Sequence, residues 1–427
     1  MEETVVQAPL FDNMYNTHGE LKGWQESIGT WCIGNHRLAF AVCAALSGPL
    51  LALTSAEGGG FHFWGGSSLG KTTLLHAAGS VAGGGGVNGF LRQWRATDNG
   101  LEAVAAMHND NVLCLDEIGQ ASAKVVAETA YMLANGQGKS RALKDGMAKK
   151  AASWRLVFLS TGEMTLEDKI REEGKRMMAG QAVRVVDIPA DAGMDMGIFA
   201  DLHGHEGGHT FSQAVKTASS RHYGHALRAW LAALAADRPR SEDTARKRLK
   251  AITEQLCPAS ADGQVTRVAE RFALAATAGE MAIDFGLLPW PKESAVQAAW
   301  SCMQGWLATR GGTGPAEETA LYRHVRSFFD TNGASRFTDV DAVHEQTVHN
   351  RVGYRRNIGG EKEYLLFPEA FRNELCLNMS PTDAAALLKK KGWLKTGTDG
   401  RATESLRIKG ENGTRRMYRF RFDSVVL

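Results

Sequence analysis

Apolar runs and amphipathic stretches alternate through the first half of the chain. Four short runs have the apolar composition of buried strands: residues 61–64 (FHFW), 111–117 (NVLCLDE), 154–163 (WRLVFLSTGE) and 183–190 (VRVVDIPA). Two stretches repeat apolar side chains with helical spacing, residues 72–83 (TTLLHAAGSVAG) and 122–135 (SAKVVAETAYMLAN). Strands that alternate with helices predict an α/β domain with a mostly parallel sheet.

The rest of the chain has a different character. Residues 1–25 are polar and irregular, whereas residues 26–56 have a helical pattern. The apolar run LAFAVCAALSGPLLAL is interrupted by Ser47, Gly48 and Pro49. We expect a buried helix, a break and a second short element there, with each half too short to span a bilayer.

Alanine-rich helices are predicted after residue 205, and RGGTGP (310–315) reads as a linker before a smaller, basic region that ends in RRMYRFRF. That last segment fits an edge strand or the wing of a winged helix, whose basic groups would contact phosphates or dock a protein. The predicted organisation is an N-terminal helical lead-in (1–56), a core domain that contains the parallel sheet (57–205), a helical subdomain (206–309) and a C-terminal winged-helix-like domain (316–427).

Composition restricts the possibilities only a little. The chain has 427 residues, a formal net charge of +2 and 44% hydrophobic residues, which is ordinary for a globular protein. The six cysteines are scattered and include no CxxC pair, so neither a zinc site nor a disulfide framework is indicated. Free cysteines fit a reducing cytosol, and a cytoplasmic location is expected.

Residues 65–72 (GGSSLGKT) match G-x-x-x-x-G-K-[ST] between a strand and a helix. Backbone N–H groups of such a loop point at phosphate oxygens. Lys71 is expected to reach the β- and γ-phosphates of ATP, and the Thr72 hydroxyl to bind Mg²⁺. The predicted nucleotide-binding residues are Gly65, Gly66, Ser67, Ser68, Leu69, Gly70, Lys71, Thr72 and Thr73.

Two further strand ends complete the predicted site. Asp116 is expected to hold Mg²⁺, and Glu117 to orient and deprotonate the attacking water; such a pair favours ATP hydrolysis over GTP switching. STGE, at the end of the next apolar run, offers Thr161, with Ser160 as the alternative, as a sensor of the γ-phosphate. A simple cap of the strand end is the competing interpretation.

These motifs together resemble the AAA+ helicases of phages, plasmids and genomic islands that are catalogued under a bacterial domain of unknown function. Those proteins are similar to minichromosome-maintenance helicases. The resemblance covers roughly residues 24–234 and rests on FHFWGGSSLGKTT, RQWRATDNGLEAVA, VLCLDE, YMLANGQGKSRA, WRLVFLSTGE and AGQAVRVVDIPA. It implies a ring-shaped homo-oligomer, expected to be a hexamer, that acts on single-stranded or forked DNA. Since the family often carries a primase upstream, either a separate primase or polymerase is a partner or this chain is a fragment.

The resemblance also implies a β-hairpin in the basic stretch between residues 135 and 154. Asp145-Gly146 is the expected tip, and Lys144 is expected to contact the DNA backbone. The other basic residues of this stretch are Lys139, Arg141, Lys149 and Lys150. Without the resemblance, the stretch is simply a solvated basic loop.

Three arginines are candidates for completing the nucleotide site. Arg184 is the first candidate for an arginine finger supplied by a neighbouring subunit, Arg176 the second, and Arg267 the candidate for a second sensor. Surface cations are the alternative reading of the two finger candidates. HEGGH (205–209) matches the zinc-protease pattern, but two consecutive glycines disfavour the helix that this chemistry needs.

The predicted function is therefore an ATP-driven DNA helicase or translocase that replicates a mobile element. A replication initiator or helicase loader without unwinding activity is the alternative, against which Glu117 argues. A machine acting on protein is a third possibility, disfavoured because the expected hairpin is cationic and not aromatic.

Overall fold

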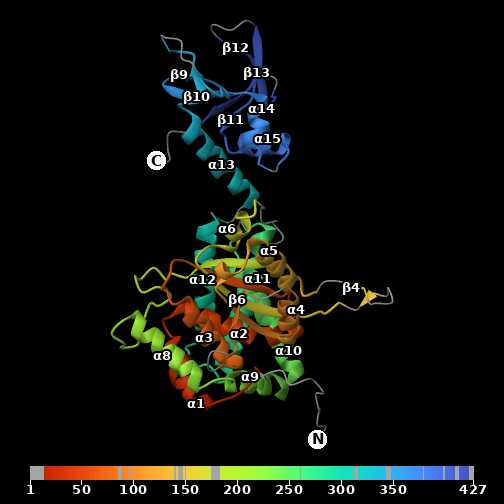
Figure 1. Ribbon diagram of the computed structural model, residues 1–427, viewed down its shortest axis with the longest axis vertical. Coiled ribbons are helices and arrows are strands. Elements are labelled where there is room, and N and C mark those ends of the chain that lie inside the picture. Colours follow the sequence, from red (N-terminus) through yellow and green to blue (C-terminus); the bar gives the residue numbers. More distant parts are fainter. Residues whose placement is uncertain are drawn as a thin grey trace. The chain divides into compact units, whose positions relative to one another are not determined.

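The chain divides into two compact units, Met1–Thr313 and Gly314–Leu427, in the computed structural model (Figure 1). The structure describes residues 14–84, 89–95, 98–138, 141–142, 148–149, 151–174, 183–259, 261–310, 312, 316–342, 348–377, 379–397, 400–408 and 413–422.

The first unit is built around a five-stranded parallel sheet, so the prediction of a mixed α/β fold with a parallel sheet is confirmed. Its strands are, in spatial order, β2 (Arg92–Gln93), β3 (Asn111–Asp116), β6 (Leu156–Gly162), β1 (Gly59–Trp64) and β7 (Val185–Pro189). The four apolar runs read from the sequence correspond to β1, β3, β6 and β7. They are apolar throughout because side chains on both faces of the sheet are buried.

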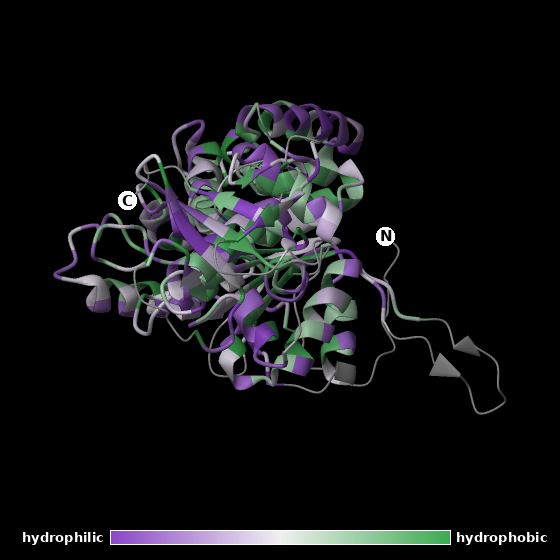
Figure 2. Ribbon diagram, turned by 90° about the horizontal axis from the view of Figure 1, so that it is seen from above, coloured by the Kyte–Doolittle hydropathy of each residue, from purple (hydrophilic) through white to green (hydrophobic). Residues whose placement is uncertain are grey.

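Two apolar layers cover the sheet. On one face, Val157 and Leu159 of β6 pack in the main core with α2 (His36–Thr54) and α3 (Lys71–Ala82). On the other face, Leu156 and Phe158 pack with α4 (Asp98–Met107), α5 (Ala123–Asn135) and α6 (Leu166–Arg171). Figure 2 shows the hydrophobic colour gathered among the packed elements and strongly hydrophilic stretches on outer helices.

Helix α2 corrects one expectation from the sequence, because it runs unbroken through Pro49. Proline inside a helix removes one backbone hydrogen bond and crowds a carbonyl, at a cost of about 3 kcal/mol. The burial of almost every side chain along α2 outweighs this cost. Gly48 is a site of close approach and not a break, since a Cβ there would lie 2.5 Å from the Asn111 Cα on β3.

By length and composition α2 is also apolar enough to cross a membrane, the one such helix in the described part of the chain. However, 83% of its apolar window is buried inside the molecule, which is the behaviour of a core helix.

Helices α8 to α12 follow the sheet and complete the first unit. Helix α11 packs against α2, α10 and α12, and α8 and α9 pack against α3. Their bounds are α8 (Gly208–Arg221), α9 (His225–Ala236), α10 (Arg238–Leu256), α11 (Gly263–Asp284) and α12 (Ser294–Arg310). The short helical segments of this unit are α1 (Leu21–Trp24), η1 (Gln25–Gly29) and η2 (Ile118–Gln120).

The basic stretch between α5 and β6 contains a short antiparallel pair, β4 (Arg141–Ala142) and β5 (Ala148–Lys149). Arg141 pairs with Lys149, and Figure 1 draws β4 well outside the layers that sandwich the sheet. The expected tip, with Lys144, lies outside the described residues, as do Lys139 and Lys150.

The second unit has a mostly antiparallel six-stranded sheet in the order β11-β13-β10-β9-β8, with β12 paired to β13. Its strands are β8 (Phe337–Asp339), β9 (Gly353–Ile358), β10 (Glu361–Leu366), β11 (Leu394–Lys395), β12 (Thr403–Arg407) and β13 (Thr414–Arg421). Its helical segments are α13 (Ala316–Asn332), α14 (Pro368–Ala370), η3 (Phe371–Leu375) and α15 (Pro381–Lys390).

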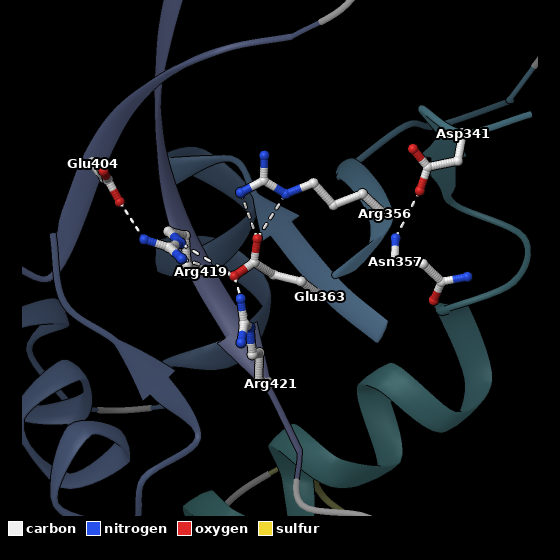
Figure 3. A network of polar contacts seen from close by, with 7 residues as sticks. All are labelled: Asp341, Arg356, Asn357, Glu363, Glu404, Arg419 and Arg421. Atoms are coloured by element: carbon white, nitrogen blue, oxygen red, sulfur yellow. Dashed lines mark hydrogen bonds and ion pairs between the residues drawn. The ribbon is translucent and has the colours of Figure 1, made fainter. Parts of the chain in front are cut away.

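Of the two readings of RRMYRFRF, the edge strand is wrong, because β13 has strands on both sides, whereas the wing of a winged helix stays a prediction. Strand β13 pairs with β10 on one side and with β11 and β12 on the other. The basic residues misled the prediction: apolar Met417 and Phe420 are fully buried, while Arg419 and Arg421 both pair with Glu363 (Figure 3).

Candidate nucleotide site

The glycine-rich loop lies where β1 ends and α3 begins. Gly65 and Gly70 have φ angles of 151° and 91°, positive values that glycine adopts without strain, and Ser68 between them is left-handed with a φ of 66°. A residue distant in the sequence also fixes the loop, because the Ile198 amide donates a hydrogen bond to the Leu69 carbonyl at 2.9 Å. The loop therefore makes a tight turn directly before α3, a helix of twelve residues. The free N–H groups in the first turn of a helix favour binding of an anion.

Lys71 lies almost buried at the start of α3, with 8% of its surface exposed. Its Nζ donates hydrogen bonds to the carbonyls of Gly65 at 2.7 Å and Gly66 at 2.6 Å. Burial lowers the pKa of Lys71, and nearby carboxylates, Glu117 first, partly offset this. The ammonium is therefore folded over the loop and close to negative charge.

Three side chains from three elements meet beside this loop. Thr72 Oγ1 donates a hydrogen bond to Asp116 Oδ1 at 3.2 Å, and Thr161 Oγ1 donates one to the same oxygen at 2.5 Å. The Glu117 amide in turn donates to Thr161 Oγ1 at 3.2 Å. The hydroxyl and carboxylate oxygens of Thr72 and Asp116 are the hard ligands that Mg²⁺ prefers, so these residues fit that ion.

The order of the strands explains why Thr161 takes part. Strand β6 lies between β1, which leads into the loop, and β3, which ends at Asp116. Carboxyl ends of parallel strands share one edge of a sheet, so the end of β6 falls between the other two ends. Thr161 is 1% exposed and has no room to turn away.

Glu117 has an unusual backbone. Its φ of 56° is a left-handed value that costs a non-glycine residue about 1–2 kcal/mol. In this conformation Glu117 Oε1 accepts a hydrogen bond from the Gly119 amide at 3.2 Å. The strain occurs at the residue expected to activate water, which is where backbone strain tends to collect in enzymes.

Ser160, the alternative sensor, points to the other face of the sheet. Its hydroxyl contacts His62 Nδ1 at 2.9 Å and accepts a hydrogen bond from Trp94 Nε1 at 2.8 Å. His62 Nε2 lies 2.9 Å from the Met164 carbonyl, and burial lowers the pKa of this histidine to about 4. His62 and Trp94 lie in stretches that carry the family resemblance, but the sequence indicated no role for either side chain.

Arg184 and Arg267 lie at the opposite edge of the sheet. Arg184 precedes β7, and its carbonyl accepts a hydrogen bond from the amide of Gly60, near the start of β1. The strand rise puts it about 16 Å from the edge that carries the glycine-rich loop. Its guanidinium stands over the Tyr131 ring at 5.6 Å.

Arg267 is exposed on α11 and lines a pocket of about 250 Å³ with Glu57, which precedes β1, and Arg271. Burial lowers the pKa of Arg271 to about 10, and both Arg184 and Arg267 are close enough to lower this pKa further. The arginines therefore share one edge, away from the loop of their own chain. Arg176 lies outside the described residues.

The two histidines of HEGGH lie on different elements. His205 lies in a loop with its Nδ1 2.8 Å from the Leu202 carbonyl, whereas His209 is on α8. Among the described residues no group of three or more histidine, cysteine, aspartate or glutamate side chains could hold a metal.

Comparisons with known proteins agree with part of the resemblance seen in the sequence. A family model described as a domain of unknown function, DUF927, matches residues 2–153. This range includes the glycine-rich loop and Asp116-Glu117 but ends before Thr161. Among curated proteins nothing matches.

Among solved structures, the chain is similar to SCCmec type IV Cch, described as an active helicase. The identity is 18% and the TM-score 0.66, over 99% of this chain and 74% of that one. This likeness extends the shared fold to both units of the chain. NtrX from Brucella abortus in complex with ATP also matches, at 13% identity over 60% of this chain and 66% of that one, but its TM-score of 0.24 is too low to show a shared fold.

Proposed function

We propose that the protein is an ATP-driven DNA helicase or translocase of a mobile genetic element. The observation that carries the proposal is the meeting of Thr72, Asp116 and Thr161 beside Lys71, with Glu117 joined to the same group. A loop that only binds nucleotide needs neither a carboxylate next to Asp116 nor a hydroxyl from a third strand. The helicase fold of the SCCmec protein supports the choice of DNA as substrate.

Each residue has a distinct task in this proposal. Lys71 exchanges its loop carbonyls for phosphate oxygens, which as charged acceptors bind an ammonium more strongly. Thr72 and Asp116 hold Mg²⁺, which would neutralise charge on the β- and γ-phosphates. Glu117 accepts the proton of the attacking water once it leaves the Gly119 amide.

Thr161 links these tasks, because one hydroxyl donates to Asp116 and accepts from the Glu117 amide. Loss of the γ-phosphate would shift the group around Asp116 and, through Thr161, the backbone of the catalytic glutamate. We assign Thr161 as the sensor in preference to Ser160, whose hydroxyl contacts His62 and Trp94 on the other face.

The arginines would serve a neighbouring subunit. Arg184, Arg267 and Arg176 are proposed to complete a nucleotide site in a ring, expected to be hexameric. The positions of Arg184 and Arg267, at the edge away from the loop of their own chain, support this arrangement. A charge supplied at the moment of transfer is worth several orders of magnitude in rate in other phosphoryl-transfer enzymes.

DNA would be gripped by the basic stretch that contains β4 and β5. Lys144, Lys139, Arg141 and Lys149 are the proposed contacts to the phosphate backbone, with little sequence preference and strong salt dependence. We further propose an AAA+ core over residues 57–205, a helical subdomain over 206–309, a winged-helix-like role for 316–427, and a separate primase or polymerase as partner.

The test compares ATP hydrolysis with and without single-stranded DNA, alongside unwinding of a forked duplex. We expect DNA to stimulate hydrolysis, and Glu117→Gln to abolish turnover while ATP binding persists. Lys144→Ala should reduce unwinding at least tenfold and leave basal hydrolysis unchanged. Hydrolysis that ignores DNA, together with unwinding that survives Lys144→Ala, would reject the proposal in favour of an initiator or loader.

A further inference from the structure

Ser160, which precedes Thr161 on β6, lies at the centre of a chain of buried hydrogen bonds. Its hydroxyl accepts from Trp94 Nε1 at 2.8 Å and lies 2.9 Å from His62 Nδ1. At the far end of the chain, His62 Nε2 lies 2.9 Å from the Met164 carbonyl. The three side chains are each at most 1% exposed. Because a buried strand of a parallel sheet normally carries apolar side chains, this row of polar groups needs an explanation.

The direction of each hydrogen bond in this chain follows from the chemistry of its groups. A carbonyl oxygen only accepts, so His62 Nε2 carries the proton and donates to Met164. Burial lowers the pKa of His62 to about 4, so at neutral pH its Nδ1 is bare and accepts from the Ser160 hydroxyl. The indole N–H of Trp94 only donates, and the Ser160 oxygen accepts from it. Every polar hydrogen of the chain therefore has a partner, which favours one fixed arrangement of the three side chains.

Trp94 also binds the strand that carries Asp116. It follows β2 directly, and its amide donates a hydrogen bond to the Asp116 carbonyl at 3.2 Å, which extends the pairing of β2 with β3 by one residue. Since β3 lies between β2 and β6, the indole has to span the width of β3 to reach Ser160. Strands two places apart in a sheet are separated by about 10 Å, so this contact needs a long and rigid side chain.

These contacts close a loop around Asp116. The Trp94 amide holds the carbonyl of Asp116, and the Trp94 indole holds Ser160. The residue after Ser160 is Thr161, whose hydroxyl donates to the Asp116 carboxylate. The main chain and the side chain of Asp116 are therefore fixed by one connected path, which the Glu117 amide joins through Thr161 Oγ1. A shift of β6 along β3 would break at least one of these bonds.

Stabilisation of the sheet is the alternative explanation of this chain of bonds. A set of buried, hydrogen-bonded polar groups can often be replaced by apolar groups of similar shape at little cost, so stability alone does not call for it. The protein also holds a bond of the same kind away from the site, from Trp24 Nε1 to Ser80 Oγ at 2.8 Å. Ser80 lies near the end of α3, about 12 Å along the helix from Thr72. The two bonds join the same groups at the same length in buried surroundings, so the second serves as a matched control.

We propose that Trp94 and Ser160 are positioning residues for nucleotide hydrolysis. Through the closed loop they hold the Asp116 carboxylate and the Thr161 hydroxyl at the spacing that Mg²⁺ and the γ-phosphate require, while His62 fixes the direction of the Ser160 hydroxyl. The inference rests on the proposed function for the identity of the nucleotide and of the reaction. Mg²⁺ demands near-ideal octahedral geometry, so a small displacement of the Asp116 carboxylate weakens its binding. Residues that orient a metal ligand contribute about ten- to a hundredfold in metal affinity or activity in other proteins.

The experiment compares Ser160→Ala and Trp94→Phe with the unaltered full chain in two assays. The first, without turnover, titrates Mg²⁺ and follows the binding of a fluorescent ATP analogue that is not hydrolysed. The second measures kcat and KM for ATP hydrolysis. We expect half-maximal Mg²⁺-dependent binding to need about tenfold more Mg²⁺, and kcat to fall about ten- to a hundredfold. KM at saturating Mg²⁺ should stay the same, because the glycine-rich loop and Lys71 are unchanged.

Trp24→Phe and Ser80→Ala are the matched controls, since they remove the same kind of bond elsewhere in the first unit. They should lower the melting temperature about as much as the site variants do, but leave kcat and the Mg²⁺ dependence unchanged. The double variant Trp94→Phe with Ser160→Ala should be no slower than Ser160→Ala alone, because both changes remove one shared bond.

Unchanged kcat and Mg²⁺ dependence in Ser160→Ala, in a protein that hydrolyses ATP, would overturn this inference and leave the proposed function standing. A shifted Mg²⁺ dependence in the site variants alone, in a protein that binds ATP without hydrolysing it, would support the positioning role at Asp116 and reject the proposed function. A protein that binds no nucleotide would overturn both. If Ser160→Ala does not fold, Trp94→Phe keeps an aromatic ring and the backbone amide, and the same outcomes apply to it.

Discussion

Ser160 and Thr161 show at the scale of single residues how far the sequence can be read. The sequence shows where an apolar strand ends and which small polar residues follow it. From these we predict a hydroxyl beside Asp116. Which hydroxyl points there depends on which face of β6 meets the loop, and that follows from the strand order. Only the structure separates Thr161, bonded to Asp116, from Ser160, bonded to His62 and Trp94.

A row of polar residues crosses the sheet where the sequence suggests only core. His62 on β1 is in register with Ser160 on β6 and with Asp187 on β7. Asp187 Oδ1 accepts a hydrogen bond from the Leu166 amide at 3.0 Å, yet burial raises the pKa of this carboxyl to about 7. Ser160 and Asp187 follow His62 in the sequence by 98 and 125 residues, so no local pattern brings the three residues together.

Replacing Asp187 by asparagine should stabilise the first unit, and more so at high pH. The folded protein holds the Asp187 proton up to about pH 7, whereas the unfolded chain releases it near 3.8. The free energy of unfolding therefore falls as pH rises from about 4 to 7, and an amide that still accepts from Leu166 avoids this loss. We expect Asp187→Asn to gain about 2–3 kcal/mol more at pH 8 than at pH 5, measured by thermal or urea unfolding.

The lowered pKa of His62 acts in the opposite direction, since it favours the folded state as pH rises from about 4 to 6.5. This contribution of His62 is the same in the unaltered protein and in Asp187→Asn, so the difference between their free energies of unfolding reports on Asp187 alone. Asp195→Asn, on an exposed loop, removes the same charge and should show no such dependence. Identical gains at both pH values would mean that Asp187 is ionised in the folded protein throughout.

At the scale of elements, the strands and helices around the site could be read from the sequence, because each is either apolar throughout or amphipathic and ends at a clear signal. Two readings failed for the same reason. Pro49 indicated a break in α2, and the arginines of β13 indicated an edge strand. In both segments the burial of side chains against residues distant in the sequence outweighs the local signal. Local signals weigh about 3 kcal/mol or less, and the packing of a whole helix exceeds that.

Gly48→Ala provides a test of this account of α2. An alanine in a helix is normally better than glycine by about 1 kcal/mol. At Gly48 the new methyl would meet the Asn111 backbone, with the nearest atom at 2.5 Å, so we expect a loss of about 1–3 kcal/mol in the free energy of unfolding. Gly263→Ala in the first turn of α11 has open space and should be neutral or slightly stabilising. A stabilised Gly48→Ala protein would show that α2 and β3 are not in close contact.

At the scale of the whole molecule, the candidate site residues of the first unit lie at two separate edges of the sheet. The glycine-rich loop, Asp116 and Thr161 lie where the strands end, whereas Arg184, Arg267 and Arg271 lie where they begin. A single chain cannot bring the two edges together, because a rigid sheet lies between them. Head-to-tail contact of identical chains joins one edge to the other and closes into a ring when the rotation permits.

This separation leads to a prediction about mixed assemblies. Lys71→Ala disables the loop of its own chain but leaves Arg184 intact, and Arg184→Ala does the reverse. Each protein alone should be inactive in ATP hydrolysis, whereas an equal mixture should form about one complete interface in four and recover a corresponding share of the rate. Mixing Lys71→Ala with Glu117→Gln is the matched control, since both changes affect the same edge and no complete site can form. If the first mixture is as inactive as the control while both proteins still assemble, Arg184 does not act on the neighbouring nucleotide, and Arg267→Ala should be tested in its place.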